Sequence, residues 1–357
     1  MISESDLKEK LQSIQLSEGD KFEYDTDAIL KAYQKNSENK SGLAIKILSI
    51  LGSFLAMLAF GGFLYAAGLS NSKYGLLLFG LVFIIVAVLM NKENEKLIVD
   101  TLSASLYIIG FALLSTGLSV FKLDDNIISL VFIVTAFLAL YITQNYILSF
   151  ISIIISGGSL LSLILINENY NTIHIYILFY ALSLVFVFLN EPKIIIYNKK
   201  LGRLYNPLRI GVLFSFLVGL IFIGKRNLIP ISQIYMWVSS IVMFSAVIYM
   251  VYKILDVLKI NSLKNKMLIY TLCIFILLPT LYAPAISGAI LILLMSFYVN
   301  YKTGLVIGVI ALIYFVSQYY YDLNFTLLTK SILLFSSGLL FLIFYLILSK
   351  NTLNEKV

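Results

Sequence analysis

Charged residues and metal-binding side chains are scarce in this sequence. Asp, Glu, Lys and Arg make up 13% of its 357 residues, against about a quarter in soluble domains. A soluble fold needs more polar surface than this, so the composition excludes a soluble enzyme, a disordered chain and a nucleic-acid-binding protein. The single cysteine, Cys273, has no partner for an intrachain disulfide. One histidine, His174, and one cysteine cannot supply an ordinary zinc, copper or haem ligand set, so we expect no metal and no cofactor.

Long apolar runs fill most of the chain. Hydrophobic residues make up 60% of it, and the mean hydropathy is +0.94. Runs of about 20 such residues predict an all-α fold, a polytopic transmembrane helical bundle. The twelve predicted spans are 45–69, 75–90, 97–120, 127–142, 146–166, 173–189, 208–224, 234–252, 267–283, 285–299, 304–318 and 331–348. The predicted domains are a cytoplasmic N-terminal segment with short amphipathic helices (1–42), the transmembrane domain (43–349) and a cytoplasmic tail (350–357).

Two breaks leave the topology open. The apolar region 127–166 is interrupted only at 143–145, and the region 267–299 is interrupted by Pro279 and Pro284. A short polar or proline-containing break is either a turn between two spans or a kink in one helix. Each region therefore forms two spans, or a kinked or re-entrant helix.

Basic residues predict the orientation of the chain. With the N-terminus inside, 21 of the 26 Lys and Arg residues fall in the N-terminal segment, the even-numbered breaks and the tail, and five fall on the other side. Cytoplasmic loops of membrane proteins carry this excess of positive charge. We expect both termini in the cytoplasm. The abundance of Ile, Lys, Asn, Tyr and Phe is typical of an AT-rich bacterial genome, so the expected location is the bacterial cytoplasmic (inner) membrane.

Ionisable groups at membrane depth are the usual functional candidates, because they are costly to hold there. Asp100 lies about four residues inside the third span, where Lys96 is one helical turn away and offers an ion pair. His174 lies at the outer end of the sixth span, where we interpret it as a residue at headgroup level. No acid lies at mid-depth, and no catalytic motif occurs. We expect a protein that is not an enzyme.

Small residues recur at helical spacing within the predicted spans. Gly211, Ser215 and Gly219 are four residues apart, and Gly304 and Gly308 form a GxxxG pair. Small residues let the backbones of neighbouring helices approach closely. We expect these positions to pack inside the bundle.

A polar segment near the C-terminus carries the most distinctive pattern. It runs from Tyr319 through the three tyrosines, Asp322 and Thr326 to Lys330 and Ser331. This pattern resembles the C-terminal signature YYxLxxTLLxKS of a bacterial domain-of-unknown-function family of uncharacterised polytopic inner-membrane proteins. The glycine-containing first span is also similar to the first span of that family, and the likeness of hydropathy covers the chain beyond residue 42. The resemblance implies an inner-membrane location and a possible partner, a membrane or envelope protein encoded by a neighbouring gene.

These residues form the candidate interaction site on the outer face: Tyr319, Tyr320, Tyr321, Asp322, Thr326, Lys330 and Ser331. A lysine beside phenolic rings can bind an anionic headgroup or the acidic edge of a periplasmic protein. The alternative is a well-anchored helix end, with Thr326 capping a helix and Lys330 paired with Asp322.

Three classes of function remain. The chain is predicted to be a non-catalytic membrane component or permease-like protein of the bacterial envelope. The alternative is a carrier of a neutral or lipidic solute, and an intramembrane enzyme is a remote third. The partners considered are the lipid bilayer and the envelope protein, nucleic acid is excluded, and the sequence does not fix the oligomeric state.

Overall fold

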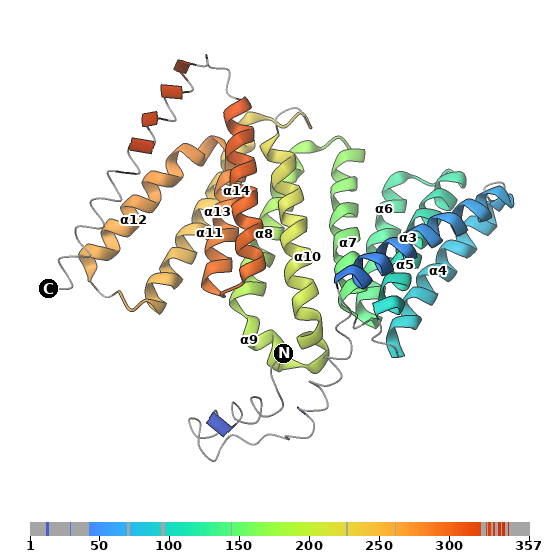
Figure 1. Ribbon diagram of the computed structural model, residues 1–357. Helices are drawn as coiled ribbons and strands as arrows, with labels where there is room; N and C mark the ends of the chain where they lie inside the picture. The colour runs from blue at the N-terminus through green and yellow to red at the C-terminus, as the bar shows by residue number, and fades with distance from the viewer. Residues whose placement is uncertain are drawn as a thin grey trace. The chain divides into compact units, whose positions relative to one another are not determined.

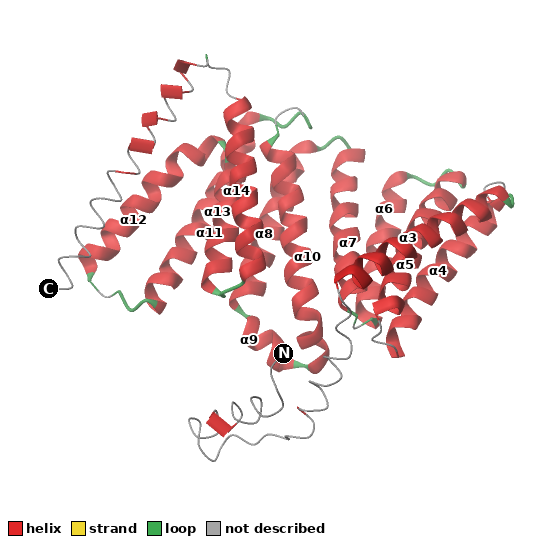
Figure 2. Ribbon diagram, in the orientation of Figure 1, coloured by secondary structure: helices red, strands yellow, loops and turns green. Residues whose placement is uncertain are grey.

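The computed structural model describes residues 12–13, 29, 43–69, 72–93, 97–143, 145–225, 228–260, 262–322 and ten positions between 326 and 342. Within these ranges every regular element is a helix, as Figure 2 shows, and no strand occurs. The prediction of an all-α fold is therefore confirmed. In a hydrocarbon environment a helix satisfies its own backbone hydrogen bonds, which explains why the apolar runs become helices.

The chain divides into two compact units. The first is Met1–Asp124 with Tyr141–Leu148, and the second is Asp125–Leu140 with Ser149–Val357. The helices of the first unit, labelled in Figure 1, are α3 (Leu43–Ala66), α4 (Lys73–Glu93) and α5 (Leu97–Val120).

Two glycines bring α4 and α5 into backbone contact. A Cβ atom built on Gly80 would lie 2.8 Å from the backbone nitrogen of Leu114 and 3.1 Å from the carbonyl oxygen of Gly110. Only residues without a side chain allow two helices to approach this closely. These glycines therefore set the spacing of the helix pair in the first unit.

The second unit contains the remaining helices of the described chain. They are α6 (Asp125–Ile142, whose end joins the first unit), α7 (Tyr146–Ile166), η3 (Tyr170–Thr172), α8 (Ile173–Leu189), α9 (Glu191–Tyr197), α10 (Lys199–Gly224), η4 (Gln233–Tyr235), α11 (Met236–Val257), α12 (Leu263–Leu277), η5 (Leu278–Tyr282), α13 (Pro284–Tyr298) and α14 (Lys302–Asp322). Buried residues are frequent on α7, α8, α10 and α13, whereas α12 buries only Leu277. The core of this unit therefore lies around α7, α8, α10 and α13.

Both open breaks separate two helices. Near the start of α6 and the end of α7, Asn126 and Asn167 exchange side-chain hydrogen bonds of 2.6 and 3.3 Å. One turn further in, Ser129 donates to Ser162 at 3.3 Å. The two helices therefore form an antiparallel hairpin rather than one kinked helix. The second break is filled by η5, which separates α12 from α13.

Eleven of the twelve predicted spans coincide with helices, to within a few residues at most boundaries. Among the described residues, nine helices are long and apolar enough to cross a membrane, and Leu51–Leu64 and Pro284–Tyr298 are shorter apolar helices. The twelfth span, 331–348, falls largely outside the described residues, although the positions that are described there are helical.

Residues 190–207, which separate the predicted spans 173–189 and 208–224, are almost entirely helical rather than a loop. Pro192 stands in the first turn of α9, where a missing N–H costs nothing. The side chain of Asn198 accepts a hydrogen bond from the N–H of Lys200 at 3.1 Å and caps α10. The basic residues of this segment predict a cytoplasmic location. They do not exclude a helix, because charged residues are common on helices at the protein surface.

The small-residue stripe of α10 packs against α7 and α8. A Cβ atom on Gly211 would lie 2.8 Å from the side chain of Ile153, and one on Gly219 would lie 2.8 Å from the ring of Tyr176. Between them, Ser215 faces Gly157 of α7. The stripe therefore serves internal packing in this structure, as its spacing indicates.

Candidate functional site

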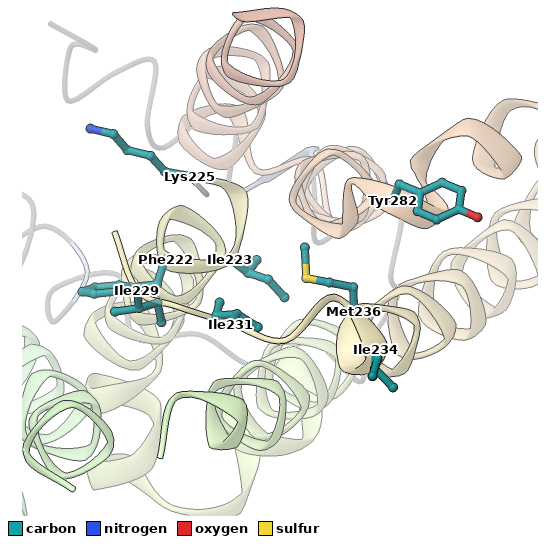
Figure 3. A pocket seen from close by; sticks show the side chains of 8 residues that line it. All are labelled: Phe222, Ile223, Lys225, Ile229, Ile231, Ile234, Met236 and Tyr282. Carbon is teal, nitrogen blue, oxygen red and sulfur yellow. The ribbon is translucent and has the colours of Figure 1, made fainter. Parts of the chain in front are cut away.

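A cavity of about 370 Å³, lined mainly by residues of apolar type, lies in the second unit where α10 ends and α11 begins. Its lining residues are Phe222, Ile223, Lys225, Ile229, Ile231, Ile234, Met236 and Tyr282. In Figure 3 the side chains of Ile223, Ile231 and Met236 turn toward one another, whereas the amine of Lys225 and the hydroxyl of Tyr282 point away from them. The cavity thus has an apolar centre and polar tips at its edge. The C-terminal end of α14, at Asp322, lies in the same region, which we call the Asp322 end.

Hydrogen bonds hold the walls of this cavity in place. The backbone N–H of Ser232 donates to Oδ1 of Asn171 at 3.2 Å and ties the segment after α10 to the start of α8. The hydroxyl of Ser240 donates to the carbonyl oxygen of Leu281 at 2.6 Å and fixes η5 against α11. Residues far apart in sequence therefore form one ordered wall.

A second cavity, of about 20 Å³, adjoins the first, and we call this second one the small cavity. The two share Ile223, Met236 and Tyr282 as common wall. Tyr319 and Asp322 line only the small cavity. A volume of 10–15 Å³ or more on this scale holds one water molecule, so the small cavity takes a group of that size.

The carboxylate of Asp322 is only half satisfied. Its Oδ1 accepts a hydrogen bond from Nε2 of Gln318 at 3.0 Å, one helical turn earlier on α14. Its Oδ2 is buried and has no hydrogen-bond partner among the described residues. A buried carboxylate oxygen without a donor is costly, so this atom is a strong acceptor for a ligand group.

The rest of the predicted outer-face site does not gather at the cavities. Tyr320 and Tyr321 contact each other edge to face at 5.7 Å, and the side chain of Tyr321 is 76% exposed. Ser331 donates to the carbonyl oxygen of Leu328 at 2.9 Å, as residues within a helix do. Lys330 lies outside the described residues, and so does its predicted pairing with Asp322.

Thr326 behaves as the predicted helix cap. The backbone N–H of Thr329 donates to its Oγ1 at 3.3 Å, and the hydroxyls of the two residues are 2.8 Å apart. A side-chain oxygen that accepts from the N–H three residues later is the usual N-cap contact. Thr326 therefore has a structural role at the start of the last helical segment.

His174, in the first turn of α8, is buried between helices. Only 4% of the residue is exposed, and its Nδ1 lies 2.7 Å from the hydroxyl of Ser239 on α11. Its Nε2 is buried without a partner among the described residues. This contact places α11 against the face of α8 that carries His174. The sequence could not reveal which side of α8 meets another helix.

Asp100 contacts an asparagine that the sequence did not indicate. Its Oδ1 accepts a hydrogen bond from Nδ2 of Asn145 at 2.8 Å. The Oδ1 of Asn145 accepts from the N–H groups of Ile147 and Leu148 at the start of α7. The predicted partner Lys96 lies outside the described residues. Asp100 therefore orients a helix cap within the first unit.

A cluster around Arg209 at the opposite end of α10 and α14 was not predicted. The guanidinium carbon lies 3.7 Å from the ring centroid of Tyr301 and 5.0 Å from that of Tyr205. Its NH1 is 3.7 Å from Glu191, and its NH2 donates to Asn206 at 2.9 Å. The spacing of Tyr205 and Arg209, one helical turn apart, is the only sequence signal, because Tyr301 comes from the turn before α14.

The described residues of the site are suited to binding. Its described parts are an apolar cavity, a lysine and a tyrosine at the edge, and one under-satisfied carboxylate. No group of three or more His, Cys, Asp or Glu residues that could hold a metal ion occurs among the described residues. Such a lining suits an amphipathic molecule, because apolar pockets with a few polar groups bind ligands in a fixed orientation.

Comparison with known families gives one match. The model of a family described as a domain of unknown function, DUF4401, matches residues 42–351. No curated protein and no solved structure matches the chain.

Proposed function

We propose that this chain, which belongs to the DUF4401 family, a domain of unknown function, is a non-catalytic, permease-like membrane protein. From the geometry of the site we infer that it binds a lipid-like molecule at the Asp322 end. The observation that carries this proposal is the apolar cavity of about 370 Å³ with Lys225 and Tyr282 at its edge. An acyl chain fills an apolar space, while a cationic or phenolic edge suits a headgroup.

The proposed topology has twelve spans with both termini in the cytoplasm of a bacterium, and the Asp322 end lies on the outer side of the inner membrane. The basic residues support this orientation, since 21 of 26 then face the cytoplasm. Helix α13 has 15 residues, about 22 Å at 1.5 Å per residue, which is short for a bilayer of about 30 Å. Most of α13 is buried by protein, so its length need not match the lipid.

The Arg209 cluster supports a permease-like role. It ties α10 to the start of α14 at the end of these helices opposite the cavity. A carrier that exposes its site on one side must close its other side. The arrangement fits a site accessible at the Asp322 end and closed at the Arg209 end.

Filling the cavity tests the proposal. In the Ile223→Trp variant, the indole occupies space next to Met236, so we expect the protein purified in mild detergent to retain less lipid by native mass spectrometry. Ile231→Trp fills the same cavity from a half-buried loop position and serves if Ile223→Trp does not fold. The matched control is Ile241→Trp, on an exposed face of α11 away from the cavity. Equal lipid retention in the cavity variants and the control would reject the proposal.

A flux measurement separates a carrier from a binding component. Liposomes containing the protein and a fluorescent lipid are compared with empty liposomes for lipid movement between leaflets. Movement above the empty liposomes supports the carrier, and Ile223→Trp should abolish it. Movement equal to that of empty liposomes leaves a membrane component that binds lipid without carrying it.

The exposed tyrosines favour a second function, attachment of an envelope protein. Tyr321 is 76% exposed and contacts Tyr320 edge to face, a pair suited to a protein contact. A photo-crosslinking amino acid at position 321 should then capture a protein encoded near this gene. Capture of lipid alone would reject this role.

A further inference from the structure

The small cavity beside Asp322 adjoins the larger one. Three residues line both spaces, so the two cavities are neighbours, and a ligand that occupies both would meet the carboxylate. At about 20 Å³, the small cavity admits one group of the size of a water molecule. The group that enters it is therefore the end of a ligand, and the larger cavity takes the rest.

The chemistry of that end follows from the atoms around it. The unpartnered Oδ2 of Asp322 is a negatively charged acceptor, so it requires a donor, and a positively charged donor forms the stronger hydrogen bond. Tyr282 and Tyr319 add aromatic rings to the lining, and rings attract cations. An anionic or carbonyl end of a ligand is itself an acceptor, so it cannot donate a hydrogen bond to this carboxylate.

On this basis we propose that the ligand is an amphiphile with a primary ammonium headgroup, of the phosphatidylethanolamine class, whose ammonium group occupies the small cavity against Asp322. This inference rests on the proposed function, since it assumes that the larger cavity holds the apolar part. A primary ammonium group is about as large as a water molecule, whereas a trimethylammonium group exceeds the space. A metal cation is a poorer occupant, because the described lining offers a single carboxylate where such ions take several oxygen ligands.

Lipid selectivity tests the inference on the full-length protein. The protein is delipidated in detergent and titrated with phosphatidylethanolamine, its mono- and dimethylated forms, phosphatidylcholine and phosphatidylglycerol with identical acyl chains. We expect phosphatidylethanolamine to bind about tenfold more tightly than phosphatidylcholine, with affinity falling at each added methyl group, since a charged hydrogen bond is worth a factor of this order. Equal affinity for all five lipids would overturn the inference without any variant.

Asp322→Asn isolates the carboxylate. The variant removes the charge while keeping the shape, so the preference for phosphatidylethanolamine should fall to a ratio of about one, and phosphatidylcholine should still bind. Asp125→Asn is the control, because Asp125 is an acid in the first turn of α6 and does not line either cavity. The control should keep the wild-type preference. A preference unchanged in Asp322→Asn, as a bound water alone would give, overturns the inference.

The two proposals fail in different ways. If Ile223→Trp leaves the binding of every lipid unchanged, the larger cavity is not the lipid site and the proposed function fails. If Ile223→Trp weakens every lipid but Asp322→Asn keeps the preference for the ammonium headgroup, only the present inference fails.

Discussion

The side-chain amide of Asn145 bonds three residues, two through its oxygen and one through its nitrogen. Its oxygen accepts hydrogen bonds of 2.8 and 3.2 Å from the N–H groups of Ile147 and Leu148, and its nitrogen donates to Asp100. The first N–H groups of a helix have no partner within the helix, so this cap matters most where water is scarce. Asp100, at the membrane border, therefore acts by holding the side chain that caps the start of α7.

Replacing Asn145 with Ala should lower the free energy of unfolding by about 1–2 kcal/mol, because α7 loses its cap and Asp100 loses a donor. Thermal unfolding of the purified protein in detergent measures the change. Asn169→Ala is a matched control, since Asn169 precedes η3 but makes no side-chain cap hydrogen bond. An equal loss of stability in both variants would contradict the role given to Asn145.

Arg209 is held by its shape as well as its charge. Its guanidinium group stacks on Tyr301 at 3.7 Å, which an ammonium group on a flexible chain cannot reproduce. Glu191 is 28% exposed and 3.7 Å away, so water weakens the ion pair and the aromatic contact contributes more.

Arg209→Ala should therefore destabilise the protein by about 2 kcal/mol, and Arg209→Lys should recover less than half of that loss, since the stacking contact stays broken. The unfolding midpoint in detergent reports both. Lys193→Ala, at an exposed position of α9, should have little effect. Full recovery by lysine would show that charge alone matters at this position.

At the scale of elements, two adjacent glycines of α7 stand in opposite surroundings. A Cβ atom on Gly157 would lie 2.6 Å from the hydroxyl oxygen of Ser215 and 2.9 Å from that of Tyr180. A Cβ atom on Gly158 would meet nothing within 4 Å. The two positions share one helix and one residue type, so a comparison between them isolates the packing of α7 on α8 and α10.

Gly157→Ala should destabilise the protein by about 1–3 kcal/mol, because the new methyl group forces neighbouring helices apart. Gly158→Ala should stabilise it by about 0.5–1 kcal/mol, because alanine favours the helix and has room. Thermal unfolding of the two single variants decides the matter. Destabilisation by both variants to the same extent would show that the close packing around Gly157 does not control stability.

Hydropathy predicted the helices well because every helix in lipid must be apolar over a span of similar length. The breaks at 143–145 and at Pro284 were correctly located, but hydropathy did not show whether the chain turns back there. The side-chain contacts between α6 and α7 supplied that answer. The helices within 190–207 were missed because a charged surface helix lacks the apolar signal on which the prediction depended.

The candidate site was predictable only in part. The C-terminal signature indicated Tyr319 and Asp322, which do line the small cavity. The sequence did not indicate Tyr282 or Met236, because both reach the cavity through the packing of η5 against α11. A cavity depends on which helix faces meet, and a single sequence records the faces without their partners.

At the scale of the whole molecule, the distribution of basic residues ties orientation to the number of spans. Between Leu123 and Tyr197 the proposed topology has three spans, and between Tyr197 and Tyr321 it has five. An odd number places the two ends of each interval on opposite sides of the membrane. Leu123 and Tyr321 should therefore lie outside and Tyr197 inside, which follows the excess of lysine and arginine around α9.

Cysteine labelling tests this arrangement, since Cys273 is the only native cysteine and can be replaced by serine. Leu123→Cys and Tyr321→Cys should react with a membrane-impermeant maleimide in intact cells. Tyr197→Cys, at a residue that is 82% exposed, should react only after the cells are permeabilised.

Each departure from this labelling pattern identifies a different error. Reversal at all three positions would mean that the orientation is inverted. Protection of position 321 alone would mean an even number of crossings between α9 and the end of α14. A re-entrant α12–α13 pair would leave three crossings in this interval, so this result would require one further crossing to be gained or lost. Labelling of position 197 in intact cells, with 123 also labelled, would mean an even number of crossings in the interval that contains α6, α7 and α8. The hydrogen bonds between α6 and α7 argue for two separate crossings there, so we expect protection at 197.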